Sequence, residues 1–171
     1  MKKISAALPL SWAAFVVATD QLTKWLVMRT FEPYEVLPVI PGFFNLTFIT
    51  NTGAAFGMFA GAESVWRQVF FLVVGAAALI ILFFAFHHYR RQGLLYVVAL
   101  GLIGGGAVGN MIDRIRFGSV VDFLDFYIQG YHWPAFNVAD SAITVGVGLF
   151  LLASFLEEKK KHSAGDRKLT F

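Results

Sequence analysis

Two aspartates, Asp122 and Asp140, are the residues in this chain best suited to chemistry. Each adjoins a long apolar run, and a short loop separates them, so the chain can fold back and bring them together. A carboxylate near lipid costs several kcal/mol unless it is paired, hydrated or protonated. If the two face each other, repulsion between like charges raises one pKa, so that one serves as acid while the other serves as base. This is the chemistry of an aspartyl protease.

Each aspartate also has a simpler interpretation. Asp140 lies in NVADSAI at the start of the last apolar run, where a helix macrodipole would stabilise its charge. Asp122 has apolar neighbours in VVDFL and could be a solvated loop carboxylate. Asp125 is a rival candidate for the catalytic role and lies two residues from an expected surface position. The residues alone therefore leave the catalytic pair as one of several alternatives.

Other polar residues interrupt the apolar runs. Asp20 and Lys24 lie four positions apart on one helix face, which predicts either a structural ion pair or a direct substrate contact. Asn51, in TNTGAAFG, either belongs to a turn or shapes the substrate site, because an amide among apolar residues needs a partner. Arg114 could pair with Asp113 or anchor an anionic lipid phosphate.

Small residues and histidines have interpretations of their own. Gly101, Gly105 and Gly109 repeat at the spacing of close helix packing, and they could also make room for a substrate helix. His87 and His88 are expected at an interface rather than in a zinc site, since no third ligand is nearby. The chain has no cysteine, which excludes disulfides and thiol nucleophiles.

Composition defines the elements that must position these residues. The chain has 171 residues, of which 57% are hydrophobic and only 15% are charged, whereas soluble domains have about 45–50% and about 25%. This indicates an integral membrane protein. The net charge of +3 comes without a basic stripe, so nucleic acid is not an expected partner.

Four apolar segments approach the ~20 residues that a helix needs to cross the hydrocarbon layer. They cover about 8–28, 66–87, 93–111 and 138–156. The first looks like a secretory signal peptide, but the run continues through Asp20 and Lys24, and we expect an uncleaved anchor.

Basic residues predict the orientation, because Lys and Arg favour the cytoplasmic side. With four spans, most of them fall on the side that holds both termini, which we expect to be cytoplasmic. Residues 29–65 and 112–137 then lie outside, with both aspartates near the outer surface. The basic residues on the cytoplasmic side are Lys2, Lys3, Arg90, Arg91, Lys159, Lys160, Lys161, Arg167 and Lys168; those outside are Arg29, Arg67, Arg114 and Arg116.

The outer segments are not plain loops. The run Phe44–Ile49 alternates with a period of two, which predicts a strand. The segment FGSVVDFLDFYIQGYHW is also β-branched and aromatic. We therefore expect an all-α integral membrane protein with four transmembrane helices and a small β-rich platform on the outer (periplasmic) side. A short interfacial helix is expected near Ala62–Gln68, and residues 157–171 are expected to form a disordered cytoplasmic tail.

Five sequence blocks match a known family. DQLTK, NTGAAFG, GGAVGNMIDR, VVDF and FNVADSAITVG, in this order and at these distances, resemble bacterial lipoprotein signal peptidase, signal peptidase II. The resemblance covers residues 18–148. It implies a single membrane aspartyl endopeptidase domain over residues 1–156, in the bacterial cytoplasmic (inner) membrane. Such an enzyme removes the signal peptide of a prolipoprotein by cutting just before a cysteine that already carries diacylglycerol.

The resemblance also implies roles for residues. The family's catalytic aspartates fall on Asp122 and Asp140, and Asp125 falls outside the motif. Positions that surround or support the site fall on Asp20, Lys24, Asn51, Gly53, Gly106, Asn110, Arg114 and Asn137. No metal or cofactor is expected. The expected partners are the diacylglyceryl-modified prolipoprotein, membrane lipid and the inhibitor globomycin, and the protein is expected to be a monomer.

Two other functions compete with proteolysis. A proton-coupled carrier would use Asp20, Lys24 and Asp140 as a relay, although the sequence shows no inverted repeats. A non-enzymatic membrane assembly protein would use the polar residues only to lock helices together.

Overall fold

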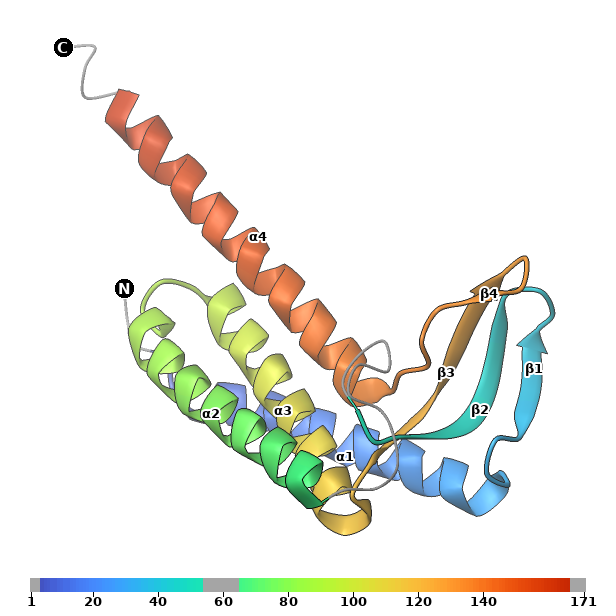
Figure 1. Cartoon of the computed structure of the whole chain (residues 1–171). Helices are drawn as coiled ribbons and strands as arrows, with labels where there is room; N and C mark the ends of the chain where they lie inside the picture. The colour runs from blue at the N-terminus through green and yellow to red at the C-terminus, as the bar shows by residue number, and fades with distance from the viewer. Residues whose placement is uncertain (1–3, 54–64, 167–171) are drawn as a thin grey trace.

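The computed structural model describes residues 4–53 and 65–166 (Figure 1). Long helices dominate this part of the chain, and a small antiparallel sheet lies at one end of them. The helices are α1 (Ala7–Thr30), α2 (Val65–Tyr89), α3 (Leu94–Phe117) and α4 (Val138–Asp166). The strands are β1 (Val36–Ile40), β2 (Phe44–Asn51), β3 (Val120–Ile128) and β4 (Tyr131–His132).

Helix α3 is the centre of the helical layer and packs against α1, α2 and α4. Its glycines allow this close approach. A Cβ added at Gly101 or at Gly105 would lie 2.8 Å from a backbone oxygen of α1, that of Pro9 or of Ala13. The prediction of close helix packing is confirmed at these positions, and α1 fills the space that a substrate helix would have needed.

Three of the described helices are long and apolar enough to cross a membrane: α2, α3 and α4. The four-span prediction is therefore met by three helices on this criterion. Helix α1 is long enough, but Asp20, Gln21 and Lys24 lower its mean hydropathy. Asp20 and Lys24 are buried inside the protein, so these two charged residues do not lie on the outer surface of α1.

The sheet has the strand order β1-β2-β3-β4, and all of its strands are antiparallel. Strand β2 confirms the strand predicted from the alternation at Phe44–Ile49. Its polar side chains Asn45 and Thr47 are the buried ones, because each finds a hydrogen-bond partner. Strand β3 pairs with β2 such that Asp122 lies opposite Ile49, which places one aspartate beside the end of β2.

Some predicted boundaries differ from the structure. Helix α3 continues to Phe117, where Gly118 ends it in a left-handed conformation at φ 73°, so residues 112–117 are helical rather than part of the platform. The predicted disorder is wrong for residues 157–166, which extend α4, because Glu and Lys are good helix formers. The first part of the interfacial helix expected at Ala62–Gln68 lies outside the described residues, and its end belongs to α2.

Candidate active site

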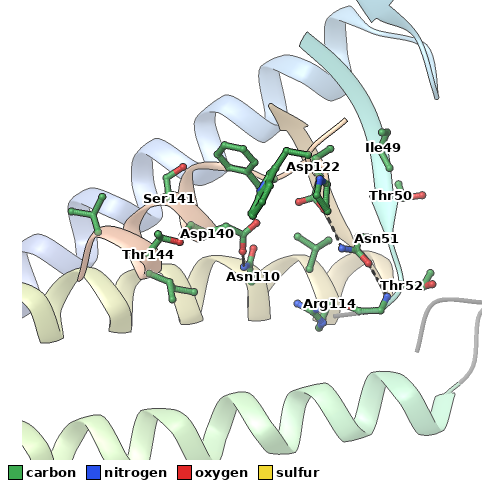
Figure 2. Close-up of a pocket in the computed structure, with 18 residues that line it drawn as sticks. Ile49, Thr50, Asn51, Thr52, Asn110, Arg114, Asp122, Asp140, Ser141 and Thr144 are labelled. Atoms are coloured by element: carbon green, nitrogen blue, oxygen red, sulfur yellow. Dashed lines mark hydrogen bonds between the residues drawn. The ribbon is translucent and has the colours of Figure 1, made fainter. Parts of the chain in front are cut away.

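Asp122 and Asp140 line the same cavity, which has a volume of about 850 Å³ (Figure 2). Asp122 comes from β3 and Asp140 from the first turn of α4. The end of β2, the C-terminal half of α3, the segment from Trp133 to Phe136 and α4 form the walls. The fold therefore brings the two predicted catalytic residues together, from two elements that are separated in sequence.

Asn137 fixes the start of α4 and with it the place of Asp140. The backbone N–H of Asp140 donates to Asn137 Oδ1 at 3.0 Å, and the N–H of Asn137 donates to Asp140 Oδ2 at 3.3 Å. This reciprocal pair has the arrangement of a capping box. The carboxylate consequently lies at a helix N-terminus, where the macrodipole favours negative charge.

Asp122 accepts hydrogen bonds from two side-chain amides. Asn137 Nδ2 donates to its Oδ1 at 2.8 Å, and Asn51 Nδ2 donates to its Oδ2 at 3.2 Å. Asn137 thus contacts both aspartates. Its Nδ2 donates to Asp122, while its Oδ1 and its backbone N–H contact Asp140. The sequence suggested no such bridging role for Asn137 apart from the resemblance.

The orientation of these amides follows from obligatory donors. Asn51 Oδ1 accepts the backbone N–H of Gly53 at 2.9 Å, and Asn137 Oδ1 accepts that of Asp140. A backbone N–H can only donate, so each amide oxygen is committed and each Nδ2 must point the other way. Both Nδ2 groups therefore face Asp122.

The environment of Asp122 raises its pKa from 3.8 to about 7. The largest cause is burial, which disfavours the ionised form, and the second is the nearby charge of Asp140. The amides of Asn51 and Asn137 act in the opposite direction but do not outweigh burial. Asp122 can therefore hold a proton near neutral pH.

A buried ion cluster between α1 and α3 lies next to the site. Lys24 Nζ lies 2.9 Å from Asp20 Oδ2 and 2.7 Å from Asp113 Oδ2, and all three side chains are at most 1% exposed. The structure confirms the ion pair of Asp20 and Lys24 that their spacing predicted. Asp20 Oδ1 also accepts the N–H of Ala139 at 2.9 Å, which ties α1 to the start of α4.

Asp113 is a member of this cluster that the sequence reasoning missed. It was considered only as a partner of Arg114, yet its salt bridge among the described residues is with Lys24. It also accepts the N–H of Val121 at 3.1 Å and a hydrogen bond from Gln21 Nε2 at 2.8 Å. Its position three residues after Asn110, on the same face of α3, was the signal that could have found it.

Arg114 and Gly53 form another contact at the cavity. Arg114 Nη2 donates to the carbonyl oxygen of Gly53 at 2.9 Å, and its guanidinium lies 4.7 Å from the centre of the Phe71 ring. Both Arg114 and Gly53 line the cavity. Arg114 therefore holds the end of β2 against α3 and also presents a cation to the cavity.

Gly106 and Asn110 place α4 on α3. A Cβ added at Gly106 would collide with the carbonyl oxygen of Ala139 and lie 2.7 Å from Ile143 Cγ1. One turn further along α3, Asn110 Nδ2 donates to Asp140 Oδ1 at 2.7 Å. The absence of a side chain at Gly106 lets this hydrogen bond form.

In the described part of the chain, Asp125 is not one of the residues that line the cavity of Asp122 and Asp140. It is buried and accepts hydrogen bonds from Asn45 Nδ2 at 2.8 Å and from His132 Nδ1 at 2.8 Å. These contacts join β2, β3 and β4. His87 lies at the far end of α2 and contacts the carbonyl oxygen of Phe83, away from the aspartates.

The fold and the cavity define a class of protein: helical membrane proteins with two aspartates in one partly apolar cavity, each of which accepts a hydrogen bond from an asparagine amide. The family model described as signal peptidase (SPase) II matches residues 12–156. The chain therefore belongs to the signal peptidase II family, and it is a peptidase of that family.

Curated relatives agree with this assignment. The chain is 49% identical over 88% of its length to a lipoprotein signal peptidase of Syntrophus aciditrophicus (strain SB), covering 93% of that protein. It is 48% identical over 94% of its length to one from Cupriavidus necator, covering 91% of that protein.

A solved bacterial membrane enzyme has the same fold. It superposes with a TM-score of 0.83 at 38% identity, covering 94% of each chain. The prediction of the family is confirmed, and the membrane character of the protein is supported by its apolar helices and by this structure.

Proposed function

We propose that the protein removes the signal peptide from diacylglyceryl-modified prolipoproteins, cutting just before the lipidated cysteine, with Asp122 and Asp140 as the catalytic pair. The observation that carries this proposal is the shared cavity: both carboxylates line it, and amide N–H groups orient both. The relatives' printed name, lipoprotein signal peptidase, supports the substrate class.

The chemistry is peptide hydrolysis. The ionised aspartate takes a proton from a water molecule between the two carboxyl groups, and the resulting hydroxide attacks the scissile carbonyl carbon. The protonated aspartate donates to the carbonyl oxygen. When the C–N bond breaks, the aspartate that took the proton from water passes it to the amine of the cysteine, which leaves with the mature lipoprotein. A hydroxyl proton of the tetrahedral intermediate returns to the other aspartate, which restores the pair. The raised pKa of Asp122 supplies one group that is protonated near neutral pH.

The cavity walls suit a lipidated peptide. Ile49, Val120, Phe136, Ile143 and Val145 give it an apolar lining. Binding of the acyl chains, remote from the reacting bond, would position the substrate for cleavage. The polar parts of the substrate would meet Asn51 and Arg114, which lie at the same cavity (Figure 2).

The placement in the membrane is part of the proposal. Helix α1 is the fourth span, because Asp20 and Lys24 are buried against other helices while Leu10, Phe15 and Leu22 are exposed. Such a helix presents apolar side chains to lipid despite its charged residues. Both termini then lie in the cytoplasm, and the sheet and the cavity lie at the outer surface of the cytoplasmic membrane.

The test is to incubate the purified protein in detergent with a diacylglyceryl-modified prolipoprotein and to follow the shortened product. The unmodified prolipoprotein is the matched control, and we expect it to be cut poorly, because acyl burial contributes roughly 0.8 kcal/mol per CH₂. Equal rates for both substrates would contradict the lipid specificity. Globomycin should block the reaction. Absence of cleavage, with proton-coupled transport by the same preparation, would favour the carrier hypothesis instead.

A further inference from the structure

Lys24 uses one of its hydrogen bonds outside the buried ion cluster. Its Nζ contacts Asp20 Oδ2 and Asp113 Oδ2, and it also donates to Asn110 Oδ1 at 3.1 Å. An ammonium has three N–H donors and no acceptor, so these contacts use all of its hydrogens. The third contact pairs no charge, since Asn110 is neutral, and it leads toward the aspartate pair.

This contact fixes which way the Asn110 amide faces, together with a longer one from Asn137 Nδ2, which donates to the same Oδ1 at 3.3 Å. Because the ammonium can only donate, the atom next to it must be Oδ1, and Nδ2 must lie on the other side. There it donates to Asp140 Oδ1 at 2.7 Å. The reversed amide would place Nδ2 against the ammonium and an oxygen against the carboxylate, and both contacts would be repulsive.

The two aspartates therefore lie in unequal surroundings. Asp140 is at the N-terminus of α4 and accepts N–H donors from Asn110 and from the backbone of Asn137, all of which favour a charged carboxylate. Asp122 lies in a strand, and its two donors are neutral side-chain amides. Burial is the largest cause of the raised pKa of Asp122, which is about 7, so this carboxyl can hold the proton near neutral pH.

We propose that Lys24 is a positioning residue for the reaction: by fixing the amide of Asn110, it holds Asp140 as the ionised base and leaves Asp122 as the acid that carries the proton. This rests on the proposed function. Asp140 then takes the proton from water, and Asp122 donates to the carbonyl oxygen. Lys24 reaches Asp140 through the hydrogen bonds of Asn110. Its charge also acts on Asp140 through space, so the two effects must be told apart by experiment.

Several charges act directly on Asp140 and must be separated from the effect through Asn110. They are the charges of Lys24 itself and of Asp20 on α1, of Arg114 on α3, and of Asp122 on β3. Removing Lys24 alone would leave two buried carboxylates without their cation, which is strongly destabilising. A change that preserves the summed formal charge is therefore needed.

The double variant Lys24→Met/Asp113→Asn meets this need, because it removes one positive and one negative charge. In a plot of kcat against pH, the acid limb is the rise at low pH, where the catalytic base becomes ionised. We expect the midpoint of this limb to move upward by about one pH unit, with KM changed by no more than about twofold. The matched control Asp113→Asn keeps the contact of Lys24 with Asn110. Its acid limb should stay in place or move downward, since a nearby negative charge is lost.

A second variant, Asn110→Ala, leaves Lys24 with both of its carboxylate partners. It removes the amide that links Lys24 to Asp140, and so tests the same link without changing Lys24. Its acid limb should also move upward by about one pH unit. In the Asn110→Ala background, adding Lys24→Met/Asp113→Asn should move the limb no further than adding Asp113→Asn does. Diacylglyceryl-modified prolipoprotein is the substrate throughout, and thermal midpoints in detergent establish that each variant is folded.

The outcomes separate this inference from the proposed function. If the unsubstituted protein does not cleave, the proposed function fails. If it cleaves but the limb of Asn110→Ala is unmoved, Lys24 does not act through this amide and the inference is overturned. Equal shifts with and without Asn110 would also overturn it, because they would show that Lys24 acts by its charge alone. A folded double variant that is inactive at every pH would do the same.

Discussion

At the scale of single residues, the site depends on side chains whose hydrogen-bonding capacity leaves one arrangement. Asn51, Asn110 and Asn137 each commit their oxygen to an obligatory donor, namely the N–H of Gly53, the ammonium of Lys24 and the N–H of Asp140. Each Nδ2 therefore faces a carboxylate. Three neutral residues in this way orient two acidic ones.

Replacement of either aspartate by asparagine should abolish cleavage. Asp122→Asn and Asp140→Asn keep the size of the side chain but remove its acid–base action, so losses of several orders of magnitude are expected, and they should be strongly non-additive. Asp125→Asn is the matched control and should retain cleavage, because Asp125 contacts Asn45 and His132 instead of the cavity. Cleavage, membrane yield and thermal midpoint should be measured together. Near-normal cleavage by either dyad variant would contradict the mechanism, and loss of activity only together with yield would indicate a structural role.

The raised pKa of Asp122 predicts a pH dependence of stability. Its folded pKa of about 7 exceeds its ordinary value of 3.8, so folding favours the protonated form. The contribution of this group is fully present below about pH 4 and is lost as the pH rises to about 7. The thermal midpoint of Asp122→Asn, which cannot ionise, should therefore rise relative to the unsubstituted protein across this window. A difference that stays constant from pH 4 to pH 8 would contradict the raised pKa.

At the scale of elements, α3 acts as the support on which the others are placed. Gly101 and Gly105 bring α1 close to it, and Gly106 brings α4 close to it. The hydrogen bond from Asn110 to Asp140 spans the α3–α4 contact. Small residues on α3 therefore serve the geometry of the site as well as the packing of the helices.

Substitution of Gly106 by alanine tests this relation. The added Cβ would collide with the carbonyl of Ala139 and with Ile143, so we expect a loss of about 1–3 kcal/mol in the free energy of unfolding. Because Asp140 would shift with α4, cleavage should fall even in the folded fraction. Gly148→Ala, in α4, is the matched control, since a Cβ there meets nothing within 4 Å. Equal thermal midpoints and rates for the two variants would show that α3 and α4 are not closely fitted at Gly106.

At the scale of the whole molecule, the helices and the sheet have different roles. The helices bury the ion cluster of Asp20, Lys24 and Asp113 and present apolar surface outside. The sheet lies at one end of the helical layer (Figure 1), and β2 and β3 contribute Asn51 and Asp122 to the cavity. The site thus lies where the two parts meet.

The proposed topology can be tested with reporter fusions. A fusion at Gln92, between α2 and α3, should report the cytoplasm, and one at Glu35, between α1 and β1, should report the outside. The physical reason is the excess of Lys and Arg on the side of both termini. If both fusions report the same side, α2 does not cross the membrane as proposed.

The sequence by itself determined the class of the protein, the helices and the strand at Phe44–Ile49. Long apolar runs and a period of two are local signals, since each residue's hydropathy carries them without reference to distant parts of the chain. The spacing of Asp20 and Lys24 also predicted their ion pair. The residues alone leave the roles of Asn51 and Arg114 open, because the sequence neighbours of a side chain do not specify its partners in space.

Only the tertiary structure decided those partners. Asp113 pairs with Lys24 of another helix, and Asn137 bridges Asp122 and Asp140 from between their two elements. Such contacts depend on the relative placement of α1, α3, β3 and α4, which results from close packing at glycines and from the register of β2 with β3. A carboxylate or amide can satisfy its hydrogen bonds in many ways, and the fold selects one because buried polar groups must be paired.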